Sequence, residues 1–331
     1  MKMNSEKVRF MNISVLGCGR WGTFIAWYVN KVGHNVTLWG REHSINYIRL
    51  KETRKNDYLS LPEDIELSNS LYKAVSSAKI IIISISAQEL RSFACQLNSI
   101  NEIQGKTFIL CMKGLEATSG KRLSQVFGEA VGKNIDVAVW VGPGHVQDFV
   151  NNIPNCMVIG SENIETTKKI VQELNSDLIR FYYGQDLIGN EIGAATKNVM
   201  GIAAGMLDGL NYSSLKGSLM ARGTRELSRL LRAMGGNDLT IYGLSHLGDY
   251  EATLFSMHSH NRKFGQALVQ GERFEKLAEG VSTVRALREL SKQYDVELPI
   301  TNALYEILFE NKNAKDTLED LFLRPVKFEF Q

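Results

Sequence analysis

Short apolar runs alternate with longer segments of helical periodicity in the first half of the chain. The runs are continuous rather than alternating, which is typical of parallel strands that are covered on both faces of a sheet. Helical segments between them, such as 21–32 and 164–174, predict right-handed crossovers and therefore a doubly wound parallel sheet. The strands are expected at residues 12–16, 35–39, 79–84, 107–111, 137–141, 157–159 and 179–183.

From about residue 189 the periodicity becomes helical, and no further strand is expected. The pattern predicts an α/β protein with a sheet domain at 12–188 and an all-helical domain at 189–331. Residues 1–11 lack the apolar stretch of a signal peptide and are expected to form a disordered leader, with Met1 and Met11 both open as the start. The helices of the second domain are expected at residues 191–207, 214–234, 262–270, 281–294 and 301–310.

Composition narrows the class of protein. The 331 residues carry a formal net charge of +2, which argues against a nucleic-acid partner because phosphate backbones need a concentrated basic face. No apolar run approaches the roughly 20 residues that span a bilayer, so membrane insertion is not expected. The four cysteines show no metal-ligand spacing, which predicts free thiols, no metal site and a reducing, cytoplasmic location.

A glycine-rich turn follows the first predicted strand. Residues 17–22 read Gly-Cys-Gly-Arg-Trp-Gly, a GxGxxG between a strand and a helix, which is the context of a Rossmann dinucleotide-binding domain. Gly17 would permit the tight turn, Gly19 the close approach of a pyrophosphate, and Gly22 the packing of the helix on the strand. The alternative is a packing turn that binds nothing. The motif therefore predicts that the Rossmann domain, 12–188, binds NAD or NADP.

The end of the second predicted strand bears on the choice between these cofactors. NAD enzymes usually place an acidic residue there for the ribose hydroxyls. Here Arg41 stands where a 2′-phosphate could be met, and Glu42 follows one residue later. The pattern favours NADP, or use of both cofactors, although Arg41 could also be an ordinary solvated arginine.

Lysines stand out in two places. Lys113 follows a predicted strand, at the sheet edge where open α/β folds bind ligands, although a lone lysine there could be an ordinary loop residue. Lys197 is the single charged residue of the segment 192–207, so it should be desolvated unless it is paired. Burial suits a lysine to proton transfer, and Asp249 is a candidate partner. The alternative is a lysine that reaches solvent from the rim of the helix.

Eight motifs occur in order from about Asn12 to Lys315: GCGRWGT, LWGRE, KGLE, GPGH, GAATKN, LGD, NRKFG and AEG. With these motifs the chain resembles the soluble bacterial type of NAD(P)-dependent glycerol-3-phosphate dehydrogenase. The resemblance implies hydride transfer between NAD(P)H and dihydroxyacetone phosphate to give sn-glycerol 3-phosphate, a precursor of glycerophospholipids. It makes the helical domain, 189–331, the substrate-binding domain, with a small-molecule substrate, and a homodimer is expected.

Matching positions imply the roles of individual residues. Lys197 corresponds to the active-site lysine of the family, and Lys113 and Asp249 to residues that bind and orient the substrate. The other implied substrate contacts are Gly142, Gly144, Thr253, Ser259, His260 and Asn261. The implied nucleotide contacts, beyond the three glycines of the turn, are Arg20, Trp21, Arg41, Lys113, Val146, Leu277 and Glu279.

Four positions depart from the family pattern. The family usually carries arginine where this chain has His260, and Ser or Thr where it has Gly144; proline and serine are usual at Ile85 and Arg20. A histidine cannot make the bidentate phosphate contact of an arginine. Two alternatives therefore stay open: a divergent paralogue that reduces another small oxo compound, phosphorylated or not, and a non-catalytic nucleotide-binding protein. Retention of Lys113, Lys197 and Asp249 argues against the second alternative.

Overall fold

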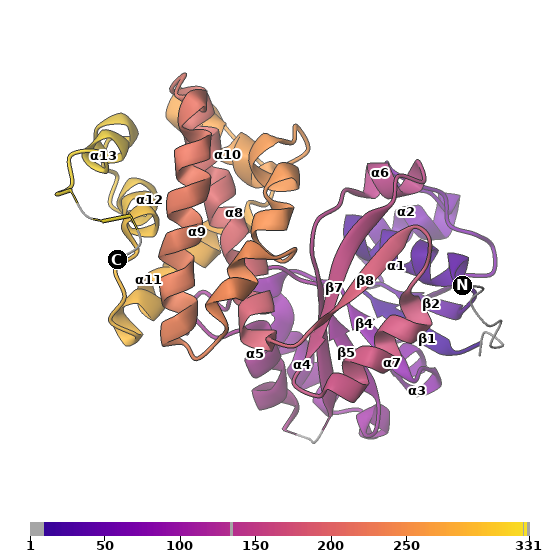
Figure 1. Cartoon of the computed structure of the whole chain (residues 1–331). Coiled ribbons are helices and arrows are strands. Elements are labelled where there is room, and N and C mark those ends of the chain that lie inside the picture. Colours follow the sequence, from indigo (N-terminus) through magenta and orange to yellow (C-terminus); the bar gives the residue numbers. More distant parts are fainter. Residues whose placement is uncertain (1–9, 133–134, 327, 330–331) are drawn as a thin grey trace. The chain divides into compact units, whose positions relative to one another are not determined.

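A computed structural model of the chain describes residues 10–132, 135–326 and 328–329 (Figure 1). Residues 1–9 of the expected leader lie outside the described residues. Phe10 is exposed, whereas the carbonyl oxygen of Met11 accepts a hydrogen bond of 3.0 Å from the backbone N–H of Asn35. Met11 is therefore hydrogen-bonded to the start of β2, one residue before the first strand begins.

Two compact units make up the chain. The sheet unit comprises the residues up to Lys113 together with Leu123–Asn190, and the helical unit comprises Gly114–Arg122 and Glu191–Gln331. The short segment Gly114–Arg122 thus belongs to the helical unit, although its neighbours in sequence belong to the sheet unit. Within the helical unit, buried Arg122 and Glu191 form an ion pair of 2.6 Å. This pair joins the segment Gly114–Arg122 to Glu191, where the longer part of the unit begins.

The described residues of the sheet unit form eight strands that run side by side (Figure 1). They are β1 (Asn12–Leu16), β2 (Asn35–Trp39), β3 (Glu66–Ser68), β4 (Ile80–Ile83), β5 (Thr107–Leu110), β6 (Asp136–Val141), β7 (Asn155–Ser161) and β8 (Ile179–Gly184). Their order is β3-β2-β1-β4-β5-β6-β7-β8, and every neighbouring pair is parallel except β6 and β7. The order reverses between β1 and β4, so the carboxyl ends of these two strands form the topological switch point where such sheets bind ligands.

Helices cover the central strands of the sheet because these strands are apolar on both faces; all four residues of β4, for example, are buried. The edge strand β8, in contrast, exposes Arg180, Tyr182 and Tyr183. The helices of this unit are α1 (Arg20–Lys31), α2 (Ile45–Thr53), α3 (Leu71–Ser77), α4 (Leu90–Asn98), α5 (Leu123–Val131), α6 (Val146–Val150) and α7 (Ile164–Leu174). Two 3₁₀ turns accompany them, η1 (Ala87–Glu89) and η2 (Asn101–Ile103).

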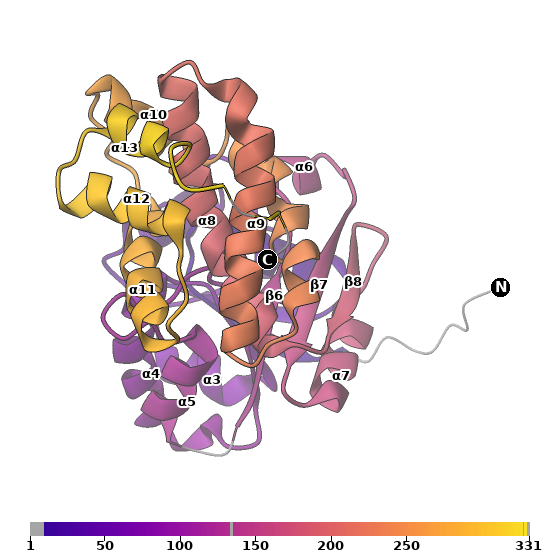
Figure 2. The same cartoon turned by 60° about the vertical axis from the view of Figure 1, so that its left-hand side comes forward.

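The helical unit shows no strand among its described residues (Figure 2). Its helices are α8 (Leu187–Gly209), α9 (Lys216–Ala233), α10 (His260–Gln270), α11 (Glu279–Gln293), α12 (Pro299–Phe309) and α13 (Ala314–Asp320), and α8 contributes its first turn to the sheet unit. Short 3₁₀ or π-helical turns connect them: η3 (Ser213–Leu215), η4 (Asp238–Tyr242), η5 (Leu247–Asp249) and η6 (Glu251–Phe255).

Glycines let α8 and α10 cross at very short range. A Cβ atom on Gly205 would overlap the carbonyl oxygen of Arg262, and one on Gly265 would overlap that of Ile202. The backbones of the two helices therefore touch, and this contact fixes where α10 begins relative to α8.

The predicted fold class is confirmed: a mostly parallel α/β sheet precedes an all-helical unit. The differences are local. The short strand β3 was not predicted, α8 is longer at both ends than the expected helix, and the pairing of β6 with β7 is antiparallel.

Candidate active site

The glycine turn lies at the switch point of the sheet. Gly17 follows β1 with a positive φ of 115°, and a Cβ atom there would overlap the carbonyl oxygen of Ser84, which follows β4. A Cβ atom on Gly22 would overlap the carbonyl oxygen of Gly17, so α1 packs directly on the turn. At Gly19, in contrast, a Cβ atom would meet nothing within 4 Å. The protein's own packing requires two of the three glycines, whereas the third leaves open space that suits the approach of a ligand.

Arg20 and Trp21 follow this turn in the first turn of α1. The Arg20 guanidinium lies 4.7 Å from the centre of the Tyr58 ring and donates a 2.7 Å hydrogen bond to the Gln147 side chain. Burial lowers the pKa of Arg20 from its ordinary value, and the nearby Tyr58 acts in the opposite direction. Trp21 packs on Phe24, with ring centres 5.0 Å apart. Arg20 therefore lies as a fixed, partly desolvated cation beside the glycine turn.

Arg41 follows β2, as the sequence indicated, and is exposed. Its guanidinium lies 3.4 Å from the Glu89 carboxylate, with side-chain exposures of 63% and 52%. Exposed pairs of this kind contribute about 0–1 kcal/mol, so Arg41 could exchange Glu89 for a phosphate at small expense.

Lys113, Gly142 and Gly144 lie at the ends of neighbouring strands. The Lys113 ammonium donates a 2.7 Å hydrogen bond to the carbonyl oxygen of Gly142. Gly144 has a positive φ of 142°, and a Cβ atom there would overlap the ring of Phe149. The backbone therefore requires glycine at position 144, which gives a physical reason for the missing hydroxyl. Val146, at the start of α6, is buried.

Lys197, Asp249 and Thr253 form the central polar cluster of the helical unit. Lys197 lies on α8, and its Nζ is 2.7 Å from Asp249 Oδ2 and donates a 2.8 Å hydrogen bond to Thr253 Oγ1. The Thr253 hydroxyl donates in turn to the carbonyl oxygen of Asp249, at 2.7 Å. The side chains of Lys197 and Asp249 are 9% and 1% exposed. An oriented cation in such a setting can donate a proton or stabilise a developing oxyanion.

A second buried network, which the sequence analysis missed, lies beside this cluster. His246 precedes η5 and is fully buried, and its ring contacts the backbone of α8 and the hydroxyl of Tyr250. The signal that could have shown it is the run His246 to Tyr250, in which a histidine and a tyrosine flank Asp249. A buried imidazole ring needs hydrogen-bond partners, and the Gly193 carbonyl and the Tyr250 hydroxyl supply them for His246.

Ser259, His260 and Asn261 lie together at the start of α10. Ser259 caps the helix, because its Oγ accepts from the backbone N–H of Arg262 at 3.3 Å. Asn261 accepts from the backbone N–H of Gly280 at 2.9 Å, which ties the start of α10 to the start of α11. The His260 ring packs edge-on to Phe274 at 6.3 Å. The positive end of the helix dipole makes this terminus suitable for an anion.

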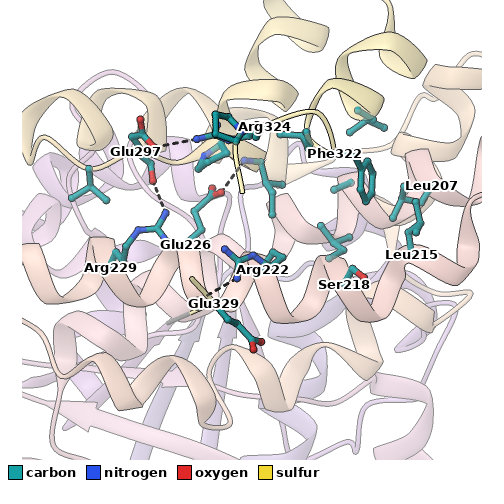
Figure 3. Close-up of a pocket in the computed structure, with 18 of the residues that line it drawn as sticks. Leu207, Leu215, Ser218, Arg222, Glu226, Arg229, Glu297, Phe322, Arg324 and Glu329 are labelled. Carbon is teal, nitrogen blue, oxygen red and sulfur yellow. Dashed lines mark hydrogen bonds and ion pairs between the residues drawn. The ribbon is translucent and has the colours of Figure 1, made fainter. Parts of the chain in front are cut away.

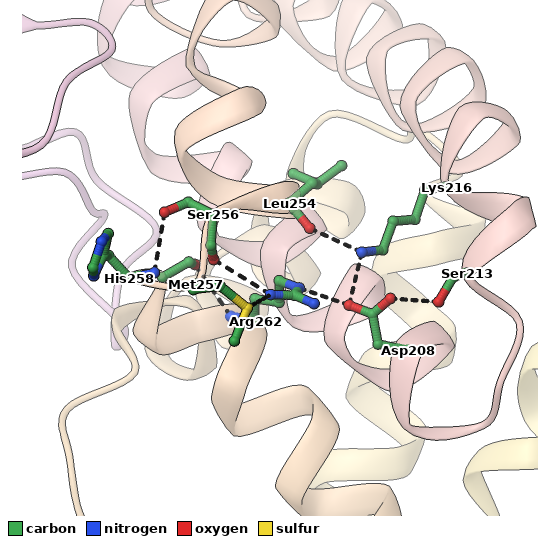
Figure 4. A network of polar contacts seen from close by, with 9 residues as sticks. Asp208, Ser213, Lys216, Leu254, Ser256, Met257, His258 and Arg262 are labelled. Carbon is green, nitrogen blue, oxygen red and sulfur yellow. Dashed lines mark hydrogen bonds and ion pairs between the residues drawn. The ribbon is translucent and has the colours of Figure 1, made fainter.

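Asp208, near the end of α8, holds two cations (Figure 4). Its Oδ2 lies 2.6 Å from Nε of Arg262 and 2.7 Å from Nζ of Lys216, and its Oδ1 accepts from the Ser213 hydroxyl at 2.7 Å. These hydrogen bonds lower the pKa of Asp208, although burial opposes them as the largest single effect. The Arg262 side chain is therefore paired with Asp208.

The remaining predicted residues lie around α11. Glu279 is its first residue, and Leu277 precedes it with 63% exposure. The predicted residues thus form three groups that the structure brings together: the glycine turn with Arg20 and Trp21, the pair Lys113 and Gly142, and the Lys197 cluster. Gly201 joins the last group to α10, because a Cβ atom there would meet both Thr253 and Asn261.

A cavity of about 840 Å³ lies elsewhere in the helical unit (Figure 3). Apolar side chains line it together with arginines and glutamates. Arg324 lies 3.1 Å from the Glu297 carboxylate, and Arg229 donates to the Glu297 backbone carbonyl oxygen at 2.9 Å. Buried Glu226 accepts the backbone N–H of Ile300 at 2.8 Å at the start of α12. None of the predicted site residues lines this cavity, so it is separate from the candidate site.

The described residues contain no group of three His, Cys, Asp or Glu side chains that could hold a metal ion. Within the same residues, no helix has the length and apolar character needed to cross a membrane.

Known proteins resemble the chain over nearly its whole length. Family models for the N-terminus and the C-terminus of NAD-dependent glycerol-3-phosphate dehydrogenase match residues 12–167 and 186–319. The glycerol-3-phosphate dehydrogenase [NAD(P)+] of Fusobacterium nucleatum is 36% identical over 97% of this chain and 99% of its own, and that of Thermoanaerobacter sp. is 35% identical over 96% and 99%.

Solved structures show the same likeness. The glycerol-3-phosphate dehydrogenase of Coxiella burnetii superposes with a TM-score of 0.87 at 26% identity, covering 95% of this chain and 99% of that one. A ketopantoate reductase from Ralstonia eutropha reaches a TM-score of 0.62 at 12% identity, over 93% and 100% of the two chains, which shows a shared fold alone.

Proposed function

Because the chain belongs to the NAD-dependent glycerol-3-phosphate dehydrogenase family, we propose that it reduces dihydroxyacetone phosphate to sn-glycerol 3-phosphate. The observation that carries the proposal is the buried Lys197, held 2.7 Å from Asp249 and 2.8 Å from Thr253. The product is the backbone of glycerophospholipids, so the reaction supplies a precursor for their synthesis.

The cofactor is assigned to the Rossmann domain, residues 12–188. The open space at Gly19 fits the close approach of a pyrophosphate to the backbone, and the start of α1 attracts its charge. A reduced nicotinamide bound there supplies the hydride. Arg20 and Trp21 would flank the phosphates, and Arg41 would bind the 2′-phosphate of NADPH by exchanging its weak pairing with Glu89. The remaining proposed contacts are Lys113, Val146, Leu277 and Glu279.

Lys197 acts on the carbonyl oxygen of the substrate. As the C2 carbonyl is reduced, negative charge develops on this oxygen, and a lysine ammonium can protonate or stabilise it. Asp249 and Thr253 fix the direction of the Lys197 side chain, so little reorganisation is needed during the reaction. Lys113, with Gly142, Gly144 and Asp249, orients the substrate.

The substrate phosphate is assigned to the start of α10, with Ser259, His260 and Asn261 as its contacts in the substrate-binding domain, residues 189–331. The helix dipole favours an anion at this end of α10. His260 supplies less charge than the arginine usual in the family. Arg262 does not replace that arginine directly, because its Nε is held by Asp208 at 2.6 Å.

The residues at the start of α10 also support a second candidate function. Since His260 stands in place of an arginine and Arg262 is engaged elsewhere, the chain could reduce another small ketone, phosphorylated or not. Oxidation of NADPH should therefore be compared with dihydroxyacetone phosphate, dihydroxyacetone and other short phosphorylated ketones. We expect dihydroxyacetone phosphate to give the highest kcat/KM, with turnover lost in Lys197→Ala and kept in the exposed control Lys292→Ala. A higher kcat/KM for another ketone would favour the second candidate.

A cytoplasmic homodimer is also proposed. The described cysteines, including exposed Cys95, are free thiols, which suits a reducing compartment. Exposed apolar side chains near the C-terminus, Phe322, Leu323, Val326 and Phe328, suit a contact between copies. Cell fractionation tests the location, and light scattering tests the dimer; a monomer at micromolar concentration would contradict the latter.

A further inference from the structure

His246 connects α8 to the turn that carries Asp249. Its Nδ1 lies 3.0 Å from the carbonyl oxygen of Gly193, and its Nε2 lies 2.6 Å from the Tyr250 hydroxyl. A carbonyl oxygen can only accept, so Nδ1 carries the proton and Nε2 accepts from Tyr250. Thr196 lies beside Nδ1 at 3.2 Å and donates its own hydroxyl to the carbonyl of Ile192 at 2.7 Å. The ring therefore has one defined tautomer and two strong directional bonds.

The ring stays neutral under ordinary conditions. Burial is the main cause that lowers its pKa to about 4, and the Lys197 charge lowers it further, while the Gly193 carbonyl and Asp249 oppose the change. A neutral imidazole can lie beside the Lys197 ammonium without charge repulsion. His246 is thus suited to hold structure rather than to exchange protons in the reaction.

His246 links the backbone of α8 to that of the Asp249 turn: its ring Nδ1 bonds to the carbonyl oxygen of Gly193, and its own carbonyl oxygen accepts the backbone N–H of Asp249 at 3.0 Å. In an α-helix, the carbonyl of Gly193 also accepts the backbone N–H of the residue four positions later, which is Lys197. Asp249 follows His246 by three residues in the short turn η5. Close packing supports this link, since a Cβ atom on Gly193 would lie 2.9 Å from Ser245 Oγ and 3.1 Å from His246 Cβ.

We propose that His246, oriented by Tyr250, is a positioning residue that holds the Asp249 turn against α8 and thereby keeps Asp249 in contact with Lys197. The inference rests on the proposed function of Lys197. It predicts that loss of the His246 bond to α8 affects turnover, although His246 is not itself placed at the reacting atoms.

The test compares His246→Ala with His246→Asn, whose amide nitrogen can replace Nδ1 as the donor to Gly193. His43→Ala, at an exposed histidine of the sheet unit, is the control. We expect kcat for dihydroxyacetone phosphate to fall about 10- to 100-fold in His246→Ala, because small displacements of catalytic groups have effects of this size. NADPH affinity should stay unchanged, and His246→Asn should recover most of the turnover. Tyr250→Phe should give an intermediate loss.

A kcat per folded molecule that is unchanged in His246→Ala would overturn the inference, even if the variant were less stable, because the role would then be structural alone. An Asn variant no better than the Ala variant would overturn it as well. If the wild type fails to reduce dihydroxyacetone phosphate, the proposed function fails, and the positioning role is read from the Lys197 ammonium resonance, identified by its loss in Lys197→Arg. That resonance, protected from exchange by Asp249, should disappear in His246→Ala and persist in His246→Asn; its persistence in both would refute the role.

Discussion

Replacing Lys197 with alanine should damage stability and turnover by different amounts. The variant leaves the Asp249 carboxylate, whose side chain is 1% exposed, without the cation that lies 2.7 Å from it. Removing one partner of a buried ion pair costs about 3–5 kcal/mol, a large part of the roughly 5–15 kcal/mol that stabilises a typical domain. The double variant Lys197→Ala/Asp249→Asn removes the uncompensated charge and should regain much of this free energy. Turnover should fall about 10²- to 10⁴-fold in both variants, since neither retains the proton donor.

Urea denaturation gives the free energies of unfolding, and NADPH oxidation with dihydroxyacetone phosphate gives turnover. NADPH affinity, measured by fluorescence, should remain near that of the wild type in both variants. If the double variant recovers stability without turnover, the catalytic and structural roles of Lys197 are separated. A single variant that keeps a third of wild-type turnover would refute the catalytic role, and one as stable as the wild type would refute the buried pairing.

Arg41→Ala should weaken NADPH binding while leaving NADH binding nearly unchanged, and equal losses in titrations with the two cofactors would contradict the assignment. Gly19→Ala should keep the melting temperature but weaken cofactor binding, whereas Gly22→Ala should lower the melting temperature, because only the second Cβ atom overlaps the protein itself. His260→Arg should lower the KM for dihydroxyacetone phosphate about tenfold or more, since a charge-assisted hydrogen bond contributes about 1.5–3 kcal/mol; an unchanged KM would mean that another group binds the phosphate. The pKa of His246 is lowered from 6.5 to about 4 in the folded state, so the unfolded chain binds the proton first as the pH falls. Stability should therefore decrease by about 3 kcal/mol between pH 6.5 and 4, and urea titrations of His246→Asn should show a flatter dependence.

The fold could be predicted well where burial leaves a pattern. The central strands of the sheet unit, such as β4 and β5, are apolar on both faces, so their runs are visible in the sequence, and the glycine turn marks the switch point. The short strand β3 could not be predicted from the sequence. It has only three residues, and the first and last of them, Glu66 and Ser68, are polar, so the segment resembles a loop. The antiparallel pairing of β6 with β7 depends on the path of the connection between them and leaves no mark on the periodicity of either strand.

The candidate site was predictable where a charge lies in an apolar setting. Lys197 stands alone in an apolar helix, and desolvation implies a partner, which the structure supplies in Asp249, 52 positions along the chain. The Arg122 and Glu191 pair left no such signal, because each lies in a segment of ordinary polarity. The missing hydroxyl at Gly144 was visible as a departure, but its reason, a positive φ against Phe149, required the backbone.

Deuterium transfer tests the central claim most directly. The protein should be incubated with dihydroxyacetone phosphate and NADPH that carries two deuterium atoms at C4 of the nicotinamide, and the product examined by mass spectrometry and NMR. We expect sn-glycerol 3-phosphate with one deuterium at C2, formed by the wild type and not by Lys197→Ala. Oxidation of the cofactor without labelled glycerol phosphate, or equal labelling by the Lys197 variant, would contradict the account.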